Sequence, residues 1–247
     1  MKNSEMLGFR SDDLSASIIK ALVERNSNIS KDDIEDLVTG CAFPEGPQGM
    51  LMARSISILA DLPVSTGGKV VNRFCGSSMD SVHQVSQAII SGDIKSGIAS
   101  GVEDMFTVPM GGFVPDFNEQ LNEKEFYIGM GETAENLARE LDITREDQED
   151  FSVFSHKKAL DAIKNGKFDN EIVSVEFNGQ TFKKDEGPRA PDIDKMKSLS
   201  PAFDAEGSIT AATSSPISLG GSAILIGNKD MADNSKSAFE IVSRSIV

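Results

Sequence analysis

Cys75 is the residue whose surroundings best suit nucleophilic chemistry. It lies in residues 71–78, VNRFCGSS, between a short β-branched stretch and a helical pattern. A thiol in front of a helix faces unpaired N–H groups and the positive end of the helix dipole, and both favour the thiolate. The small residues Gly76, Ser77 and Ser78 leave space for a substrate carbonyl. A buried structural cysteine is the alternative, and the residues alone leave the two interpretations evenly matched.

The composition excludes several classes of protein. The 24 Lys and Arg residues stand against 39 Asp and Glu residues, and the net charge of −15 argues against a nucleic-acid partner. No stretch approaches the roughly 20 apolar residues of a membrane span, and residues 1–13 lack the apolar core of a secretory signal. Two cysteines, Cys41 and Cys75, do not make a disulfide framework, so we expect free thiols and a cytoplasmic location. No metal site is predicted.

The segments around Cys75 alternate between strand and helix. Apolar spacing predicts helices over 12–24, 50–60 and 78–91, and strands ending near residue 41 and over 69–72 and 96–102. The strand over 69–72 is expected to be buried and to deliver Cys75 to a turn. Because strands and helices alternate with short links, the sequence favours an α/β layer with parallel strands.

The pattern changes after Glu103. Loops rich in Gly, Pro and Met precede two predicted helices, over 133–141 and 144–165, and a capping box over residues 144–147 begins the second. Segments 208–210 and 222–226 have strand-like composition and are expected to rejoin the sheet.

These patterns predict two domains. Residues 1–104 and 206–247 are expected to form one α/β domain, and residues 105–205 an inserted, mainly helical domain.

Several motifs carry a resemblance to a known family. Residues 71–78 and 101–105, GVEDM, resemble the thiolase signature, an Asn-Arg-Phe-Cys turn followed by a Gly-Gly-Val-Glu-Ser-Met-like strand end. Seven further segments match that family in order and spacing: residues 40–46, 130–136, 155–156, 166–168, 185–189, 201–204 and 210–215. The chain is therefore similar to the thiolases, and among them to the degradative 3-ketoacyl-CoA thiolases.

The resemblance implies a fold and an activity. The fold is a thiolase-like N-terminal domain, a mixed, mostly parallel sheet with helices on both faces, carrying an inserted loop domain. Cys75 would attack the ketone of a 3-ketoacyl-CoA, acetyl-CoA would leave, and the acyl group would pass from sulfur to coenzyme A. Coenzyme A is then a co-substrate, and no permanently bound cofactor is expected. Self-association as a dimer or tetramer is also implied.

Two further site residues follow from the resemblance. Met130 would line the acyl pocket. Ser215 would contact the pantetheine arm at the entry of the next helix, with a plain helix N-cap as the alternative role.

The sequence also departs from the family pattern. The family's Gly-His-Pro histidine, Cys-Gly-Gly cysteine and Asn-Glu-Ala-Phe segment belong to its C-terminal domain, which we expect to be absent from these 247 residues. The first strand of the family is expected to be missing before Gly8, and the loss of this central strand should leave two open edges. Leu219 and Gly221 stand where the family has Asp and Ala, which puts the order of that loop in doubt.

Neither histidine is a convincing substitute base. His83 lies eight residues after Cys75 on the same predicted helix, about 12 Å along the axis. His156 is interpreted as a structural or surface histidine.

Two hypotheses therefore remain. The first is that the chain is part of a working acyltransferase, incomplete alone, whose other residues lie on another polypeptide, a separate C-terminal half, or were lost from this sequence. The second is that it is a non-catalytic thiolase-like subunit that binds acyl-CoA or a partner. The acyl chain length and the physiological direction of the reaction stay open.

Overall fold

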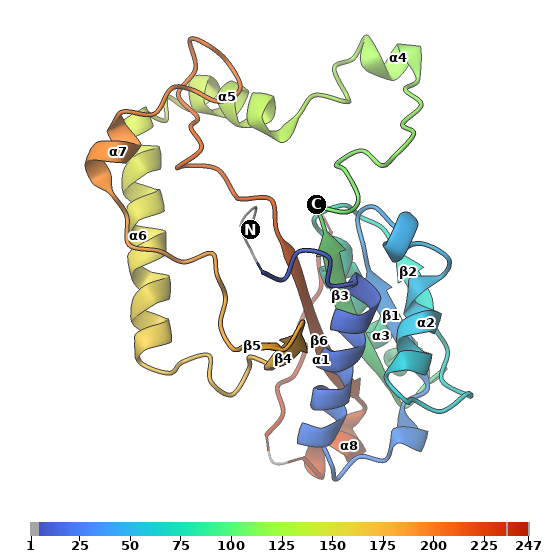
Figure 1. Ribbon diagram of the computed structural model, residues 1–247. Coiled ribbons are helices and arrows are strands. Elements are labelled where there is room, and N and C mark those ends of the chain that lie inside the picture. The colour runs from blue at the N-terminus through green and yellow to red at the C-terminus, as the bar shows by residue number, and fades with distance from the viewer. Residues whose placement is uncertain (1–4, 236, 247) are drawn as a thin grey trace. The chain divides into compact units, whose positions relative to one another are not determined.

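The described part of the chain, residues 5–235 and 237–246 of the computed structural model, divides into two units (Figure 1). The sheet unit contains residues 5–114, residues 173–182 and the described residues from 218 onward. The helical unit contains residues 115–172 and 183–217. Among the described residues, no helix has both the length and the apolar composition that crossing a membrane requires.

The sheet unit is built on four main strands. Its elements are α1 (Ser11–Arg25), β1 (Asp36–Gly40), α2 (Met52–Leu59), β2 (Lys69–Val71), α3 (Ser77–Ser91), β3 (Ser96–Asp104), β4 (Val175–Phe177), β5 (Gln180–Phe182), β6 (Leu219–Gly227) and α8 (Lys229–Asp233), with 3₁₀ turns at Lys31–Asp33 and Gly46–Gln48. The strand order is β2-β1-β3-β6. Strand β1 is parallel to β2 and β3, and β6 is antiparallel to β3. The predicted mixed, mostly parallel sheet is confirmed.

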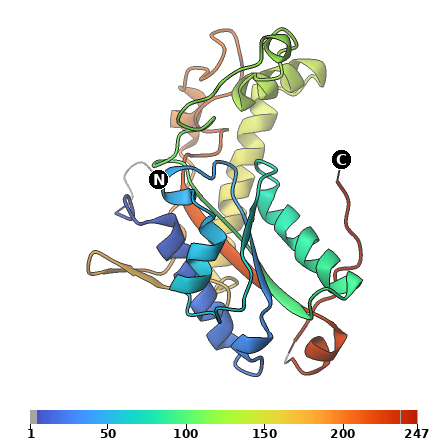
Figure 2. The ribbon, with the colours of Figure 1, turned by 90° about the vertical axis from the view of Figure 1, so that its right-hand side faces the viewer.

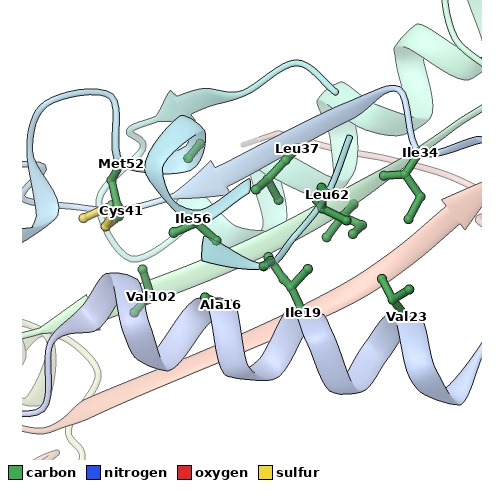
Figure 3. Close-up of a cluster of buried hydrophobic side chains, with 13 residues drawn as sticks. Ala16, Ile19, Val23, Ile34, Leu37, Cys41, Met52, Ile56, Leu62 and Val102 are labelled. Atoms are coloured by element: carbon green, nitrogen blue, oxygen red, sulfur yellow. The ribbon is translucent and has the colours of Figure 1, made fainter. Parts of the chain in front are cut away.

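Alternate residues of the two central strands face different helices. Leu37 and Ile98 lie in the buried cluster that α1 and α2 cover, whereas Val38 and Ala99 lie in the cluster that α3 covers. Neighbouring residues of a strand point to opposite faces, so one hydrophobic run serves both layers. Figure 3 shows Ile19 of α1 turned toward the first cluster, and Figure 2 shows α3 on the other face of the sheet. Helices on both faces are therefore confirmed.

Strands β1 and β3 are direct neighbours. They pair in parallel from Asp36 opposite Gly97 to Gly40 opposite Gly101. The prediction that the loss of a central strand leaves two open edges is wrong for this structure, because the strands follow one another as β2-β1-β3-β6 without a gap. Both strands are buried on both faces, and direct pairing satisfies backbone groups that water cannot reach.

The strand before Cys75 lies at the edge of the sheet. The prediction that it is buried is wrong, because β2 has only β1 as a neighbour, Lys69 is exposed, and Val70 and Val71 are half-buried. The strand itself was correctly predicted, and it does lead directly to the Cys75 turn.

Strand β6 returns the chain to the sheet, as predicted for residues 222–226. It begins at Leu219, which pairs with Asp104, and it runs antiparallel to β3 over nine residue pairs. The doubt about local order at Leu219 and Gly221 is therefore not borne out. Leu219 is half-buried and packs beside the cluster of Phe9, Leu14 and Val175.

The helical unit contains four helices. They are α4 (Glu119–Asn122), α5 (Met130–Glu140), α6 (Arg145–Lys164) and α7 (Ile193–Lys197). The predicted capping box is confirmed: the Thr144 hydroxyl accepts the Asp147 N–H at 3.1 Å, and the Asp147 carboxylate accepts the Thr144 N–H at 3.0 Å. The prediction that residues 208–210 form a strand that rejoins the sheet is wrong. Only Thr210 forms a bridge, with Pro201 of the same unit.

A hairpin that the sequence did not reveal, β4 with β5, belongs to the sheet unit. Its Phe177 ring stacks on Phe9 with centroids 4.9 Å apart. The boundaries between the two units therefore fall at 114/115, 172/173, 182/183 and 217/218. The domain boundaries at 104/105 and 205/206 stay predictions.

Candidate functional site

Cys75 lies between an edge strand and a long helix. Strand β2 ends at Val71, and α3 begins at Ser77 with Gly76 as its N-cap. No side chain caps this helix end, and the Cys75 thiol is exposed. The start of α3 and the positive end of its dipole are therefore close to the sulfur in sequence, as the residue pattern predicted.

The turn that carries Cys75 is tightly bonded. Phe74 has a left-handed backbone with φ of +44°, a conformation that costs a non-glycine residue about 1–2 kcal/mol. Ser77 offsets this cost: its hydroxyl donates to the Phe74 carbonyl at 2.6 Å and accepts the Arg73 N–H at 2.8 Å. The Arg73 guanidinium pairs with Asp80, one turn into α3, at 3.4 Å. The turn and the first part of the helix are thus one bonded unit.

Two glycines allow α3 to approach the sheet. A Cβ on Gly40 would overlap the backbone of Ser77 and Ser78, and a Cβ on Gly101 would overlap the Ser78 side chain. The helix end that follows Cys75 therefore lies directly against β1 and β3, at the carboxyl ends of the strands. Ligands of open α/β sheets bind characteristically beyond this end of the strands.

Glu103 organises the loop beside the turn, a role the sequence did not reveal. Its carboxylate accepts the Ala42 N–H at 2.6 Å and a hydrogen of the Gln48 amide at 2.9 Å. The Ala42 carbonyl in turn accepts from the Asn72 amide at 2.8 Å. The signal was present in the sequence, because residues 40–46 and 101–105 were both singled out as motifs, but only the fold shows that Glu103 joins them.

Cys41 differs from Cys75 in its exposure to solvent. It is 1% exposed, and its thiol faces Glu103 with Sγ 3.7 Å from Oε1. Burial, and next the charge of Glu103, raise the pKa of Cys41 to about 12. Its thiol stays protonated near neutral pH, so Cys41 is a packing residue and a weak donor.

Met130 and Ser215 both lie in the helical unit, and Cys75 lies in the sheet unit. Met130 is the first residue of α5 and is 62% exposed. Ser215 is exposed as well, but the predicted helix after it is absent, because the chain runs without regular structure into β6. Neither the helix entry nor the alternative N-cap role applies to Ser215.

A buried carboxylate holds the helical unit's motifs together. Glu135 of α5 is buried and accepts the backbone N–H groups of Ser208, at 3.0 Å, and Ile209, at 2.8 Å. Gly131, one turn earlier, lies against the Phe203 ring without room for a Cβ. Segments 130–136 and 201–204, which the sequence marked as separate motifs, therefore pack on each other.

The histidines have other surroundings. His83 is a buried residue of α3, and His156 of α6 accepts the Arg189 N–H through Nδ1 at 3.3 Å. The prediction that His156 is structural agrees with that bond. Among the residues that the structure describes, no group of three or more His, Cys, Asp or Glu side chains could hold a metal ion.

Comparisons with known proteins show what the chain is similar to. The family described as "Thiolase, N-terminal domain" matches residues 2–230. A 3-ketoacyl-CoA thiolase of Bacillus subtilis is 38% identical over 248 aligned residues, covering 94% of this chain and 63% of the relative. The 3-ketoacyl-CoA thiolases of a Marinomonas species and of Alcanivorax borkumensis are 39% and 40% identical, each over 94% of this chain and 61% of the relative. The chain thus spans about three fifths of the length of the curated relatives it matches.

Proposed function

This chain belongs to the thiolase family, and we propose that it takes part in acyl transfer between 3-ketoacyl-CoA or acetyl-CoA and coenzyme A, with Cys75 as the nucleophile. The observation that carries the proposal is the exposed Cys75 thiol between a left-handed Phe74 and the uncapped start of α3. A nucleophilic thiol must be accessible to its substrate, and the exposed position of Cys75 supports this role.

The proposed reaction has two transfers. The Cys75 thiolate attacks the 3-keto carbon, the bond between C2 and C3 breaks, and its electron pair leaves on C2 of acetyl-CoA, which takes up a proton. The acyl group remains on Sγ as a thioester. The thiol of coenzyme A then attacks that carbonyl and loses its proton, so that acyl-CoA leaves and the Cys75 thiolate is restored. Thiolytic cleavage and the reverse condensation follow the same steps.

The remaining roles are part of the same proposal. Met130 lines the acyl pocket, and Ser215 contacts the pantetheine arm of coenzyme A; the exposure of both side chains supports their availability to a ligand. His83 is buried in α3 and His156 is bonded to Arg189, so neither is favoured as the base, and we propose a separate C-terminal thiolase half as the partner that provides it. The protein acts in the cytoplasm as a dimer or tetramer.

The test is an adduct on Cys75. The chain is incubated with acetyl-CoA and with acetoacetyl-CoA, alone and with the C-terminal half of a relative, and analysed by intact mass and peptide mapping. We expect one acetyl group, on Cys75. Cys75→Ser should abolish the adduct, and Cys41→Ser, the matched control at a buried thiol, should retain it. No adduct under any of these conditions would reject the proposal.

The same experiment separates the non-catalytic alternative. Leu219, which stands where the family has Asp, packs among apolar side chains at the start of the ordered strand β6. Its presence therefore does not favour a non-catalytic protein. Calorimetric titration with coenzyme A completes the comparison. Binding of coenzyme A without an adduct on Cys75 would favour a binding subunit over an acyltransferase.

A further inference from the structure

Glu103 and Asn72 connect the Cys75 turn to two strand ends. The Phe74 N–H donates to Asn72 Oδ1 at 2.9 Å, and Asn72 Nδ2 donates to the Ala42 carbonyl at 2.8 Å. The Ala42 N–H donates to Glu103 Oε2 at 2.6 Å. We propose that Asn72 and Glu103 are positioning residues, which fix the direction of the Cys75 thiol by way of the left-handed Phe74. The inference depends on the proposed role of Cys75 as nucleophile.

Each bond in this series has a defined direction. The Gln48 side chain is fully buried. Its Nε2 donates to Glu103 Oε1 and to the Phe43 carbonyl, both at 2.9 Å. Its Oε1 accepts the Asp104 N–H. Cys41 also donates to Glu103 Oε1. Glu103 therefore receives three donors, and a carboxylate is the side chain that can accept them all.

The strained residue explains why the turn needs this support. A non-glycine residue stays left-handed only where its surroundings determine that conformation. Asn72 satisfies the Phe74 N–H from one side, and the Phe74 ring lies 5.9 Å from the Phe43 ring, next to Ala42. Cys75 follows Phe74 directly, so a change of the Phe74 backbone redirects the thiol.

Asn72 and Glu103 act through the backbone and do not touch Cys75, so their removal should affect orientation more than reactivity. Acylation by a thioester requires a defined approach, and a displacement of about 1 Å can cost on the order of 100-fold in rate. Alkylation by iodoacetamide, a small neutral reagent, requires only an accessible thiolate.

The experiment compares two substitutions with two matched controls. Glu103→Gln places an amide against three donors, and Asn72→Asp removes the donor to Ala42 but keeps the acceptor for Phe74. Glu45→Gln and Asn26→Asp are the controls, because Glu45 accepts the Phe113 N–H and Asn26 donates to the Leu22 carbonyl outside this series. For each protein, the rates of Cys75 acylation by acetyl-CoA and of alkylation by iodoacetamide are measured by mass spectrometry, with hydrogen exchange of residues 72–78.

We expect acylation to fall at least about tenfold in Glu103→Gln and Asn72→Asp, with alkylation within about twofold of the wild type and faster exchange over residues 72–78. The controls should match the wild type. Equal acylation in all five proteins, or parallel losses of acylation and alkylation, would overturn the positioning role.

If the wild type is acylated neither alone nor with the C-terminal half of a relative, the proposed function fails, and hydrogen exchange then decides the inference. Faster amide exchange confined to residues 72–78 in both variants would show that Asn72 and Glu103 stabilise the turn. Unchanged exchange would refute it.

Discussion

The two cysteines show how far local surroundings separate residues of one type. Cys75 is exposed in front of a helix, and Cys41 is buried against Glu103. The raised pKa of Cys41, about 12 against an ordinary 9.0, has a consequence for stability. Above pH 9 the unfolded chain releases the Cys41 proton while the folded chain retains it, so folding is penalised as the pH rises.

We therefore predict that Cys41→Ala changes the alkaline stability of the protein. Below pH 9 the substitution costs stability, since it removes buried sulfur from a packed cluster. Between pH 9 and about 12 the difference from the wild type should shrink, by at most about 1.4 kcal/mol per pH unit, because only the wild type carries the penalty. Urea unfolding of both proteins from pH 7.5 to 10.5 measures it; parallel curves would contradict the prediction.

The residues of the site were predictable to different degrees. Cys75 could be proposed as a nucleophile because its type and its place before a helical pattern are local features, and this role stays a prediction. Glu103 could not, because its partners at Ala42 and Gln48 are more than 50 residues away in the sequence, and only strand pairing brings them together. The assignment of Ser215 to a helix entry came from resemblance. It is wrong in this structure, because the chain runs without regular structure from Ser215 into β6.

At the scale of the element, the contact of α3 with the sheet depends on two glycines, Gly40 and Gly101, which have no side chain to block it. Gly40 faces the backbone of α3, which cannot move aside. Gly101 faces the Ser78 side chain, whose Oγ can rotate away but whose Cβ moves only with the backbone. Gly220 of β6 has no neighbour within reach of an added Cβ and is the natural control.

We predict that Gly40→Ala destabilises the protein most. Overpacking against rigid backbone costs about 1–3 kcal/mol or more, and it should also slow acylation of Cys75, because α3 must shift. Gly101→Ala should cost less, and Gly220→Ala should remain within about 0.5 kcal/mol. Thermal unfolding of the three variants gives the order of their unfolding free energies. An equal loss of unfolding free energy in Gly220→Ala and Gly40→Ala would refute the explanation.

The β4-β5 hairpin gives a second prediction at this scale. Phe177 is half-buried against Phe9, so Phe177→Ala should destabilise the sheet unit by roughly 1–3 kcal/mol, less than a fully buried phenylalanine. It should also expose residues 173–182 to protease. Phe151→Ala, at an exposed position of α6, is the control. Equal unfolding free energies for the two variants would show that the stacking contributes nothing.

The elements themselves followed the sequence closely where periodicity was strong. Helix α3 and strand β3 were expected over 78–91 and 96–102 and lie over Ser77–Ser91 and Ser96–Asp104. The hairpin was missed because its two strands have three residues each, too few to show an alternation. The burial of β2 was wrong because strand order, which no local pattern encodes, places it at an edge.

At the scale of the whole molecule, the two units should respond independently to local damage. Glu135 joins α5 to Ser208 and Ile209 inside the helical unit. Glu135→Gln leaves buried N–H groups facing an amide, at a cost of about 1–3 kcal/mol. We predict faster amide exchange, by about tenfold or more, within residues 115–172 and 183–217 only, because cooperative units open separately.

Hydrogen exchange with mass spectrometry tests this. Glu140→Gln, at an exposed position of the same helix, is the control and should leave both units unchanged. Equal acceleration in the sheet unit would mean that the two units unfold as one.

The pairing of β3 with β6 also sets a condition on synthesis by the ribosome. Strand β3 ends at Asp104, and its partner begins at Leu219, after the whole helical unit. At ordinary translation rates the nascent chain would carry β3 with one edge unpaired for on the order of ten seconds. An unpaired strand is a template for aggregation, so the growing chain needs protection at that edge until β6 emerges.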